Sequence, residues 1–309
     1  MSEAERRALR EDGVVYIQAG EAAGSGALLY DGRAVLTAGH VVDLVTNVAN
    51  PSVRLNVDNS TITRGVDDAL IHPEYDPRSY GKDLALLWLD DGAPAEATRY
   101  VPYRNADELG KVATLIGYGD SGTGDRGILP DTAGTRRSVE NRLDSDGGAI
   151  NDFFGGSESV GLEANAHFLI DFDNGLIAND ALGQLIGARD LGLGSLEGMV
   201  APGDSGGPAL IDGAIAGVTN AIASLSNGSA NPDVDNTLNA SYGEIGSFQR
   251  VSTQQQWLDQ SLRARYPDAP QTPDEVPVAV MEEDDEVTYA YFMLQFTGVR
   301  SFPEQILSV

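Results

Sequence analysis

The 309-residue chain contains no cysteine. Disulfide bonds therefore cannot hold the fold together, and the redox compartment stays open because a lack of cysteine suits any compartment. Basic residues are also scarce, with 20 Lys and Arg against 47 Asp and Glu, and the lysines are Lys82 and Lys111. The net charge of -27 argues against electrostatic binding to nucleic acid or to anionic membranes. Such an acidic, lysine-poor surface is typical of proteins kept soluble at high salt, where screening weakens self-repulsion.

Long hydrophobic runs are absent as well. No stretch approaches the ~20 consecutive apolar residues of a membrane-spanning helix, so we expect no membrane span. Residues 1–13 are charged throughout and do not have the pattern of a signal peptide. Whether a leader was removed or the protein stays inside the cell is left open. The hydrophobic fraction of 41% is sufficient for a substantial core in one large or two ordinary domains.

A glycine-rich segment around Ser205 is the most informative stretch of the sequence. Residues 201–208 read Ala-Pro-Gly-Asp-Ser-Gly-Gly-Pro, and glycines weaken helix and strand interiors while they permit tight loops. We therefore expect a loop that presents the Ser205 hydroxyl. In such a loop the backbone amides of Gly203 and Ser205 can point to one spot, as an oxyanion hole requires. Taken alone, a glycine-rich turn without chemistry is an equally good interpretation.

Two other segments supply suitable partners for this hydroxyl. His40 ends the apolar segment 34–38, and an imidazole accepts a proton near neutral pH because its ordinary pKa is ~6.5. Asp83 precedes the apolar segment 84–89, where a carboxylate can orient the imidazole and stabilise its charged form. Taken singly, the histidine is also explained as a structural strand end and the aspartate as a solvated cap.

The three segments together, in this order, resemble a known family. They match the motifs Thr-Ala-x-His, Asp-Ile/Leu-Ala-Leu-Leu and Gly-Asp-Ser-Gly-Gly-Pro of the chymotrypsin/trypsin-like serine peptidases. The resemblance covers roughly residues 14–262, and the loop 171–180 with Ala201-Pro202 resembles the family's bacterial branch. It implies an all-β fold of two six-stranded antiparallel barrels with a C-terminal helix. It also implies a serine endopeptidase that acts on a protein or peptide substrate through an acyl-enzyme.

Residue roles follow from the resemblance position by position. His40 is expected to be the general base, Asp83 its orienting carboxylate and Ser205 the nucleophile, with the Gly203 and Ser205 amides as the oxyanion hole. Asp204 is expected to take part in activation, because in many family members this aspartate pairs with a newly formed amino terminus. No Ile/Val-Gly-Gly start is visible in this sequence. The partner of Asp204 therefore stays open between the chain's own amino group, another cation such as an arginine, and an external trigger.

Short apolar segments alternate with turn residues along the chain and indicate an all-β organisation. We predict an N-terminal segment 1–13, a first barrel 14–104, a second barrel with its closing helix 105–262, and a proline-rich, acidic tail 263–309. The Asp-Gly pairs 31–32 and 212–213 predict hairpin turns. Ser252 or Thr253 is predicted to cap the closing helix. Residues 120–164 show little periodicity, so part of them is expected to be a surface insertion.

The predicted specificity pocket differs from that of trypsin-like members. Their pocket-base aspartate lies six residues before the nucleophile, where this chain has Met199, followed by Val200. An uncharged residue at the bottom of the pocket leaves a cationic substrate side chain without a buried partner. We therefore predict cleavage after small or medium apolar residues, with Asn220 and Ile222 in the pocket wall. Glu197 keeps arginine specificity open as an alternative if its loop is shifted.

The loop 171–180 is a candidate cation site. Asp171, Asp173 and Asp180 place carboxylates near Gly175, and such oxygens suit Ca²⁺, although the spacing and terminal glutamate of an EF-hand are missing. A polar loop stabilised by Asx turns needs no metal. A structural calcium ion therefore stays one of two interpretations, and the expected chemistry requires no cofactor.

Two alternatives to an ordinary endopeptidase stay open. One is a regulatory protease gated by its tail, which otherwise adds an edge strand or binds a partner. The other is a catalytically silent binding module on the same scaffold. The family resemblance implies a secreted or periplasmic protein, while a cytoplasmic location also fits the sequence. The physiological substrate and the oligomeric state are not determined by these patterns.

Overall fold

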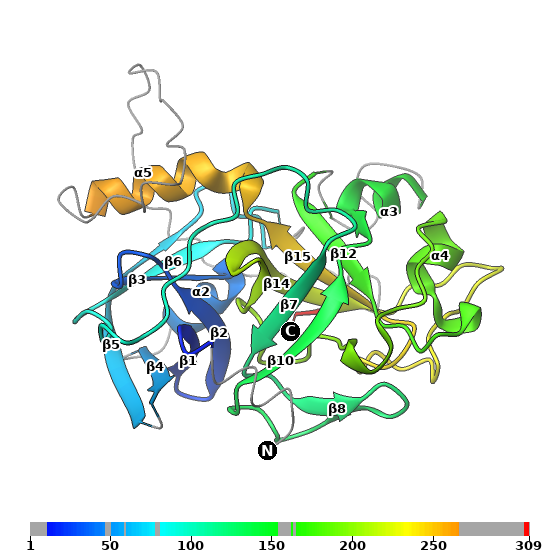
Figure 1. Cartoon of the computed structure of the whole chain (residues 1–309), viewed down its shortest axis with the longest axis horizontal. Coiled ribbons are helices and arrows are strands. Elements are labelled where there is room, and N and C mark those ends of the chain that lie inside the picture. Colours follow the sequence, from blue (N-terminus) through cyan, green and yellow to red (C-terminus); the bar gives the residue numbers. More distant parts are fainter. Residues whose placement is uncertain are drawn as a thin grey trace, which may run out of the picture.

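The computed structural model describes residues 11–46, 51–58, 60–77, 81–153, 162, 165–265 and 306–308. Most of the predicted segment 1–13 and tail 263–309 therefore lies outside the described residues. The remainder is mainly β-structure arranged in two halves, with the first at left and the second at right in Figure 1. The predicted all-β fold class is thereby confirmed. Within these ranges, no helix is long and apolar enough to cross a membrane.

The first half is a closed antiparallel barrel with the strand order β1-β2-β3-β6-β5-β4. Its strands are β1 (Val14–Ala19), β2 (Ala22–Leu28), β3 (Ala34–Thr37), β4 (Ser52–Val57), β5 (Ser60–Ile71) and β6 (Ala85–Leu89). β4 alternates buried and half-buried residues, as a strand with one face toward the core does. β3 and β6 are buried throughout. The segments after β3 and before β6, which contain His40 and Asp83, are therefore anchored to two strands that are buried throughout.

The second half is a long, curled antiparallel sheet with the order β10-β7-β13-β14-β15-β12-β11, and a further strand, β16, pairs with β14. The strands are β7 (Val112–Gly117), β10 (Arg137–Arg142), β11 (Ser145–Asp146), β12 (His167–Asp171), β13 (Pro208–Ile211), β14 (Ala214–Ala223), β15 (Ile245–Arg250) and β16 (Ile306–Ser308). The order of the described strands does not return on itself. This half is therefore a curled half-barrel, whereas the sequence predicted a closed six-stranded one.

Several local predictions can be compared with the structure. The Asp212-Gly213 turn has left-handed φ values of 50° and 79°, as a tight type I′ hairpin requires. Within 120–164, β8 (Ser121–Thr123) and β9 (Gly127–Leu129) form a separate hairpin, but β10 pairs with β7 in the main sheet. The predicted N-caps of the closing helix were wrong. Residues Ser252–Gln254 form a 3₁₀ turn, and α5 (Gln255–Arg265) begins after it.

Short helices complete the described part of the chain. α2 (Gly39–Thr46) follows β3, α3 (Gly147–Phe153) follows β11, and α4 (Ala181–Ile186) lies in the second half. α5 lies across the first barrel (Figure 1), and its Leu258 and Leu262 belong to an apolar core that joins first-barrel residues with residues of the second half such as Ile215. The helix that was assigned by prediction to the second barrel therefore packs on both halves.

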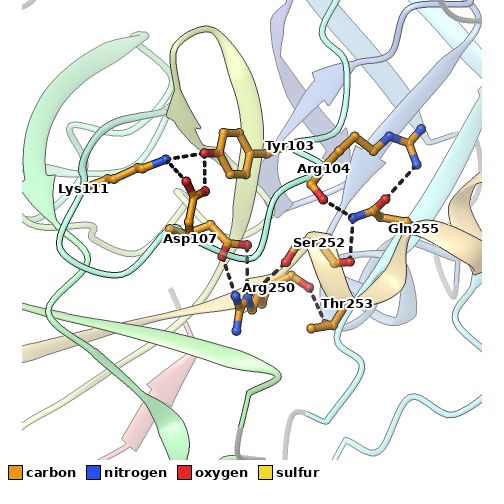
Figure 2. Close-up of polar contacts among 9 residues, drawn as sticks. Tyr103, Arg104, Asp107, Lys111, Arg250, Ser252, Thr253 and Gln255 are labelled. Atoms are coloured by element: carbon orange, nitrogen blue, oxygen red, sulfur yellow. Dashed lines mark hydrogen bonds and ion pairs between the residues drawn. The ribbon is translucent and has the colours of Figure 1, made fainter. Parts of the chain in front are cut away.

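The connection between the halves is fixed to the start of α5 by polar contacts (Figure 2). Arg104 makes hydrogen bonds of 2.7 and 2.8 Å to Asp259, and its carbonyl accepts one from Gln255. Glu108 forms a buried ion pair with Arg250 at the end of β15. Because these contacts tie the connection to elements that follow the nucleophile segment, they hold the two halves in one relative position.

Candidate active site

The predicted catalytic residues meet between the two halves. The sequence predicted that the strand would run to His40. Instead β3 ends at Thr37, and His40 lies in the first turn of α2. Asp83 lies just before β6 and follows Lys82, a non-glycine residue with a left-handed φ of 52°. Ser205 lies in the loop that precedes β13. The first half therefore supplies the histidine and the aspartate, and the second half supplies the serine.

The three side chains form a continuous hydrogen-bonded series. The His40 Nδ1 atom lies 2.7 Å from Asp83 Oδ2, and His40 Nε2 lies 2.7 Å from Ser205 Oγ. The backbone N–H of His40 also donates to Asp83 Oδ1 at 2.8 Å. Because an ionised carboxylate only accepts, the His40 proton is on Nδ1, which leaves Nε2 able to accept the hydroxyl proton. The arrangement can therefore raise the nucleophilicity of Ser205.

Two residues of the second half complete the surroundings of Asp83. The Asn220 side-chain amide donates to Asp83 Oδ2 at 3.0 Å, and the Asp83 backbone N–H donates to Gln249 Oε1 at 3.1 Å. Asp83 is completely buried, so the Asn220 donor replaces water that the carboxylate loses on burial, while Gln249 satisfies the buried backbone N–H. The sequence predicted Asn220 as a pocket residue and gave no signal for Gln249.

A serine that the sequence did not single out holds the nucleophile loop. The Ser25 backbone N–H donates to the Ser205 carbonyl at 2.7 Å, and Ser25 Oγ donates to the Gly203 carbonyl at 2.8 Å. Ser25 Oγ in turn accepts from the Tyr118 N–H at 2.9 Å. These bonds use the carbonyl groups of the loop, while no hydrogen bond within the described ranges uses the N–H of Gly203 or Ser205. Both amides are thus available to an external oxygen.

Gly206 shows why this loop depends on glycine. Its φ is +81°, and a Cβ built on it would lie 2.1 Å from the Thr37 Oγ1 atom. A side chain at this position would therefore be strained by its backbone conformation and would also collide with β3.

Comparisons with known proteins find similar sequences and similar structures. A family model described as Trypsin matches residues 3–145, which include His40 and Asp83. Serine protease filzig of Drosophila melanogaster is 30% identical over 105 residues, which are 30% of this chain and 6% of that protein. Among solved structures, neuropsin, a serine protease expressed in the limbic system of mouse brain, is 18% identical with a TM-score of 0.57, covering 82% of this chain and 96% of its own.

Residues 3–145 of this chain are therefore similar to the Trypsin family. The neuropsin comparison shows the shared fold, and the chain spans only 6% of the length of filzig. These matches are to animal proteins, so they give no support to the bacterial branch that the sequence suggested.

The carboxylate of Asp204, a half-buried residue, precedes Ser205 in the loop before β13. It accepts the backbone N–H groups of Gly119 at 2.7 Å and Ala201 at 2.9 Å. Burial nevertheless raises the pKa of Asp204 to about 6. A Cβ on Gly117 would lie 2.1 Å from its Oδ1 atom, and Gly119 is similarly tight. Both positions require glycine because the Asp204 carboxylate fills the space a side chain would take.

The predicted pocket residues are found in two places. Met199 and Val200 line a cavity of about 360 Å³ that also contacts Asp204. Ile222 is buried in the apolar core of the second half together with Val200, and Met199 packs against this core. Asn220, as described above, has its amide on Asp83. The structure therefore brings Met199, Val200 and Ile222 together and assigns Asn220 a contact with the candidate triad.

The three acidic residues of the candidate cation site also come together. One carboxylate oxygen from each of Asp171, Asp173 and Asp180 lies within 4.8 Å of the others, and all three residues are buried. Burial is the main cause that raises the pKa of Asp171 to about 7 and that of Asp173 to about 9. Burial also raises the pKa of Asp180.

The strand β16 lies beside the candidate triad. β13 pairs with β14 as far as Val218, and β16 pairs with β14 at Ala221–Ala223. Between these two stretches, Thr219 exchanges backbone hydrogen bonds with Gly206 and Gly207 of the nucleophile loop. Successive residues of β14 therefore contact the loop around Ser205, Asp83 and β16.

Proposed function

We propose that this protein is a serine endopeptidase with the catalytic residues Ser205, His40 and Asp83. The observation that carries the proposal is the series of short hydrogen bonds from Asp83 through His40 to Ser205. Ser205 Oγ bonds to the substrate carbonyl carbon while His40 Nε2 takes its proton, and the N–H groups of Gly203 and Ser205 stabilise the resulting oxyanion. His40 then gives the proton to the leaving amine as the C–N bond breaks. A water molecule activated by His40 hydrolyses the acyl-enzyme and restores Ser205.

Hydrolysis of a broad peptide library tests this proposal against a silent binding module. The wild-type chain should cleave peptide bonds, and Ser205→Ala should lower kcat by roughly 10⁶-fold. Ser60→Ala, which changes an exposed serine of β5, serves as the matched control. Cleavage that survives in Ser205→Ala, or a wild-type chain that cleaves nothing, would contradict the proposal.

We further propose that the enzyme cleaves after small or medium apolar residues. Met199 supplies no charge at the expected pocket base, and Ile222 packs into the same apolar core as Val200. Glu197, which kept arginine specificity open, accepts the backbone N–H groups of Asp173 and Leu193. Peptides with Val or Ala before the cleaved bond should therefore have a kcat/KM at least about tenfold above the Arg peptide. A preference for Arg would contradict this assignment.

A gated form of the same enzyme is the second candidate, and β16 is the observation that favours it. An extended substrate binds readily by adding a strand to an exposed sheet edge, and the edge of β14 next to the candidate triad is paired with β16. In this pairing Leu307 lies opposite Ile222, and a substrate strand would have to displace it from that edge.

Proline substitution in β16 tests the gating. Leu307→Pro removes a backbone donor and should raise kcat/KM on short peptides several-fold, as should deletion of residues 268–309. Thr297→Pro, in the same tail but outside β16, is the control and should leave turnover unchanged. Equal turnover in all variants would exclude gating.

A secreted or periplasmic location is proposed from the family resemblance alone. Fractionation of the native host cells tests it, and recovery of the full-length protein from the cytoplasm would contradict it.

A further inference from the structure

Three aspartates of the second half point to a ligand beyond the proposed peptidase site. Asp171 ends β12, Asp173 follows it, and Asp180 precedes α4. One carboxylate oxygen of each lies within 4.8 Å of the other two. Two oxygens bound to one Ca²⁺ ion at 2.3–2.6 Å are separated by roughly 5 Å at most. The spacing is therefore that of oxygens able to share one cation.

Unsatisfied oxygens supply a second observation. The exposed fractions of Asp171 and Asp173 are 1% and 4%, and the Oδ1 atom of each is buried without a hydrogen-bond partner. Leaving a carboxyl oxygen buried and unpaired is costly, and such oxygens in proteins are hydrogen-bonded or coordinate a metal. The two orphaned oxygens therefore lack the kind of partner that a bound cation provides.

The charges around the three aspartates also favour a bound cation. Asp144, Asp190 and Glu197 add further negative charge near the cluster, while Arg189 acts on Asp180 and Arg142 acts on the neighbouring Asp144. Arg142 is itself paired with Asp190. Among the described residues, carboxylates thus outnumber the cations near this point, so a dication would relieve their mutual repulsion.

We propose that Asp171, Asp173 and Asp180 bind a calcium ion. All three offer carboxylate oxygens, the hard ligands that Ca²⁺ prefers, and no sulfur or imidazole takes part. Mg²⁺ fits less well because it demands near-ideal octahedral geometry, keeps several of its waters and is rarely held in an all-protein cage.

The proposed site is linked to the segment that leads to the nucleophile. Glu197 Oε1 accepts the Asp173 backbone N–H at 2.7 Å, and Met199 and Val200 follow Glu197 toward Ser205. Asn141 joins the two segments a second time, because its Nδ2 donates to the carbonyls of Asp171 at 2.9 Å and Gly198 at 3.0 Å. Calcium would therefore stabilise the loop that carries the pocket residues, independently of whether Ser205 is a nucleophile.

Calorimetric titration of the full chain with CaCl₂ tests the proposal, after removal of metals with a chelator and in about 0.15 M NaCl to screen the acidic surface. The wild-type chain should bind one calcium ion, and Asp173→Asn should weaken the binding by roughly tenfold or more. Asp125→Asn is the matched control, because its side chain is 68% exposed and lies beside Arg126. This control should bind calcium as the wild type does.

Three results would overturn the inference. An absence of saturable calcium binding by the wild type would remove the site. Equal binding by all three chains would show attraction of counterions to an acidic surface only. Magnesium binding as tight as calcium binding would overturn the choice of ion.

Unfolding temperatures measured with and without calcium separate a loss of calcium binding from a loss of folding in the variant. Without calcium, Asp173→Asn should unfold at the same temperature as the wild type or higher, because one of several repelling carboxylates is removed. With calcium, the unfolding temperature of the wild type should rise above that of the variant, because a ligand bound to the native state stabilises that state. A wild-type unfolding temperature that calcium does not change would contradict the proposal, whatever activity is measured.

Discussion

Asp83 and Asp171 are both almost completely buried, and their carboxylates are satisfied in different ways. Asp83 accepts from the His40 backbone, the His40 ring and the Asn220 amide. Asp171 accepts from the Leu182 N–H through one oxygen, and its other oxygen has no hydrogen-bond partner. The comparison separates a carboxylate already completed by protein donors from one that still lacks a partner. The first is suited to orient a histidine, and the second to bind a cation.

The largest effect is expected when the carboxylate of Asp83 is replaced. Asp83→Asn keeps the shape of the side chain but offers His40 Nδ1 a donor as well as an acceptor, which favours the wrong tautomer. We expect kcat to fall by roughly 10⁴-fold, measured with peptide substrates, with little change in KM. A fall below tenfold would show that Asp83 does not orient His40.

Glu108 extends the comparison to a carboxylate neutralised by an arginine. Its side chain is completely buried against Arg250, so Glu108→Gln leaves a buried guanidinium without its counter-charge. Breaking such a pair should lower the free energy of unfolding by about 3–5 kcal/mol in a denaturant titration. Asp107→Gln, at a side chain that is 62% exposed, should change it by less than about 1 kcal/mol. Equal losses of unfolding free energy in the two variants would contradict the claim that burial makes the Glu108 ion pair important for stability.

Asp204 allows the effect of burial on a carboxylate to be tested by varying the pH. Burial raises its pKa from 3.8 to about 6, so the native state binds its proton more tightly than the unfolded chain. Its stabilising contribution is therefore present below pH ~4 and lost as the pH rises through ~6, by about 3 kcal/mol. The unfolding temperature of the wild type relative to Asp204→Asn should fall across this window and level off above it. A constant difference between the two chains would show that Asp204 titrates normally.

The smallest effect is expected at Ser25, which acts only through the backbone of the nucleophile loop. Ser25→Ala removes the hydroxyl that joins the Gly203 carbonyl to the Tyr118 N–H. We expect kcat to fall about tenfold, in line with the loss of one or two hydrogen bonds, while KM changes less. An unchanged kcat would show that the remaining contacts hold the loop without the hydroxyl.

Local motifs explain how much of this arrangement the sequence could predict. The segments around His40, Asp83 and Ser205 each have a recognisable composition, so the sequence alone points to the three side chains that meet at the site. Ser25 and Gln249 had no such signal, because their roles depend on chain segments far away in the sequence. The same reason explains why the link between Glu197 and Asp173 was missed.

Strand prediction had a related limit. β10 was not predicted because its residues Arg137–Arg142 are mostly polar, and pairing with β7 decides its structure. The closing helix was predicted to start too early, because Ser252 and Thr253 are good capping residues that here form a 3₁₀ turn.

Labelling with a fluorophosphonate, which reacts with activated serine hydroxyls, tests the central claim most directly. The full chain, Ser205→Ala and His40→Ala would be compared, each with and without calcium. The account predicts covalent labelling of the wild type at Ser205 and none of either variant. An unlabelled wild type under both conditions, or labelling that persists in His40→Ala, would contradict an activated serine at this site.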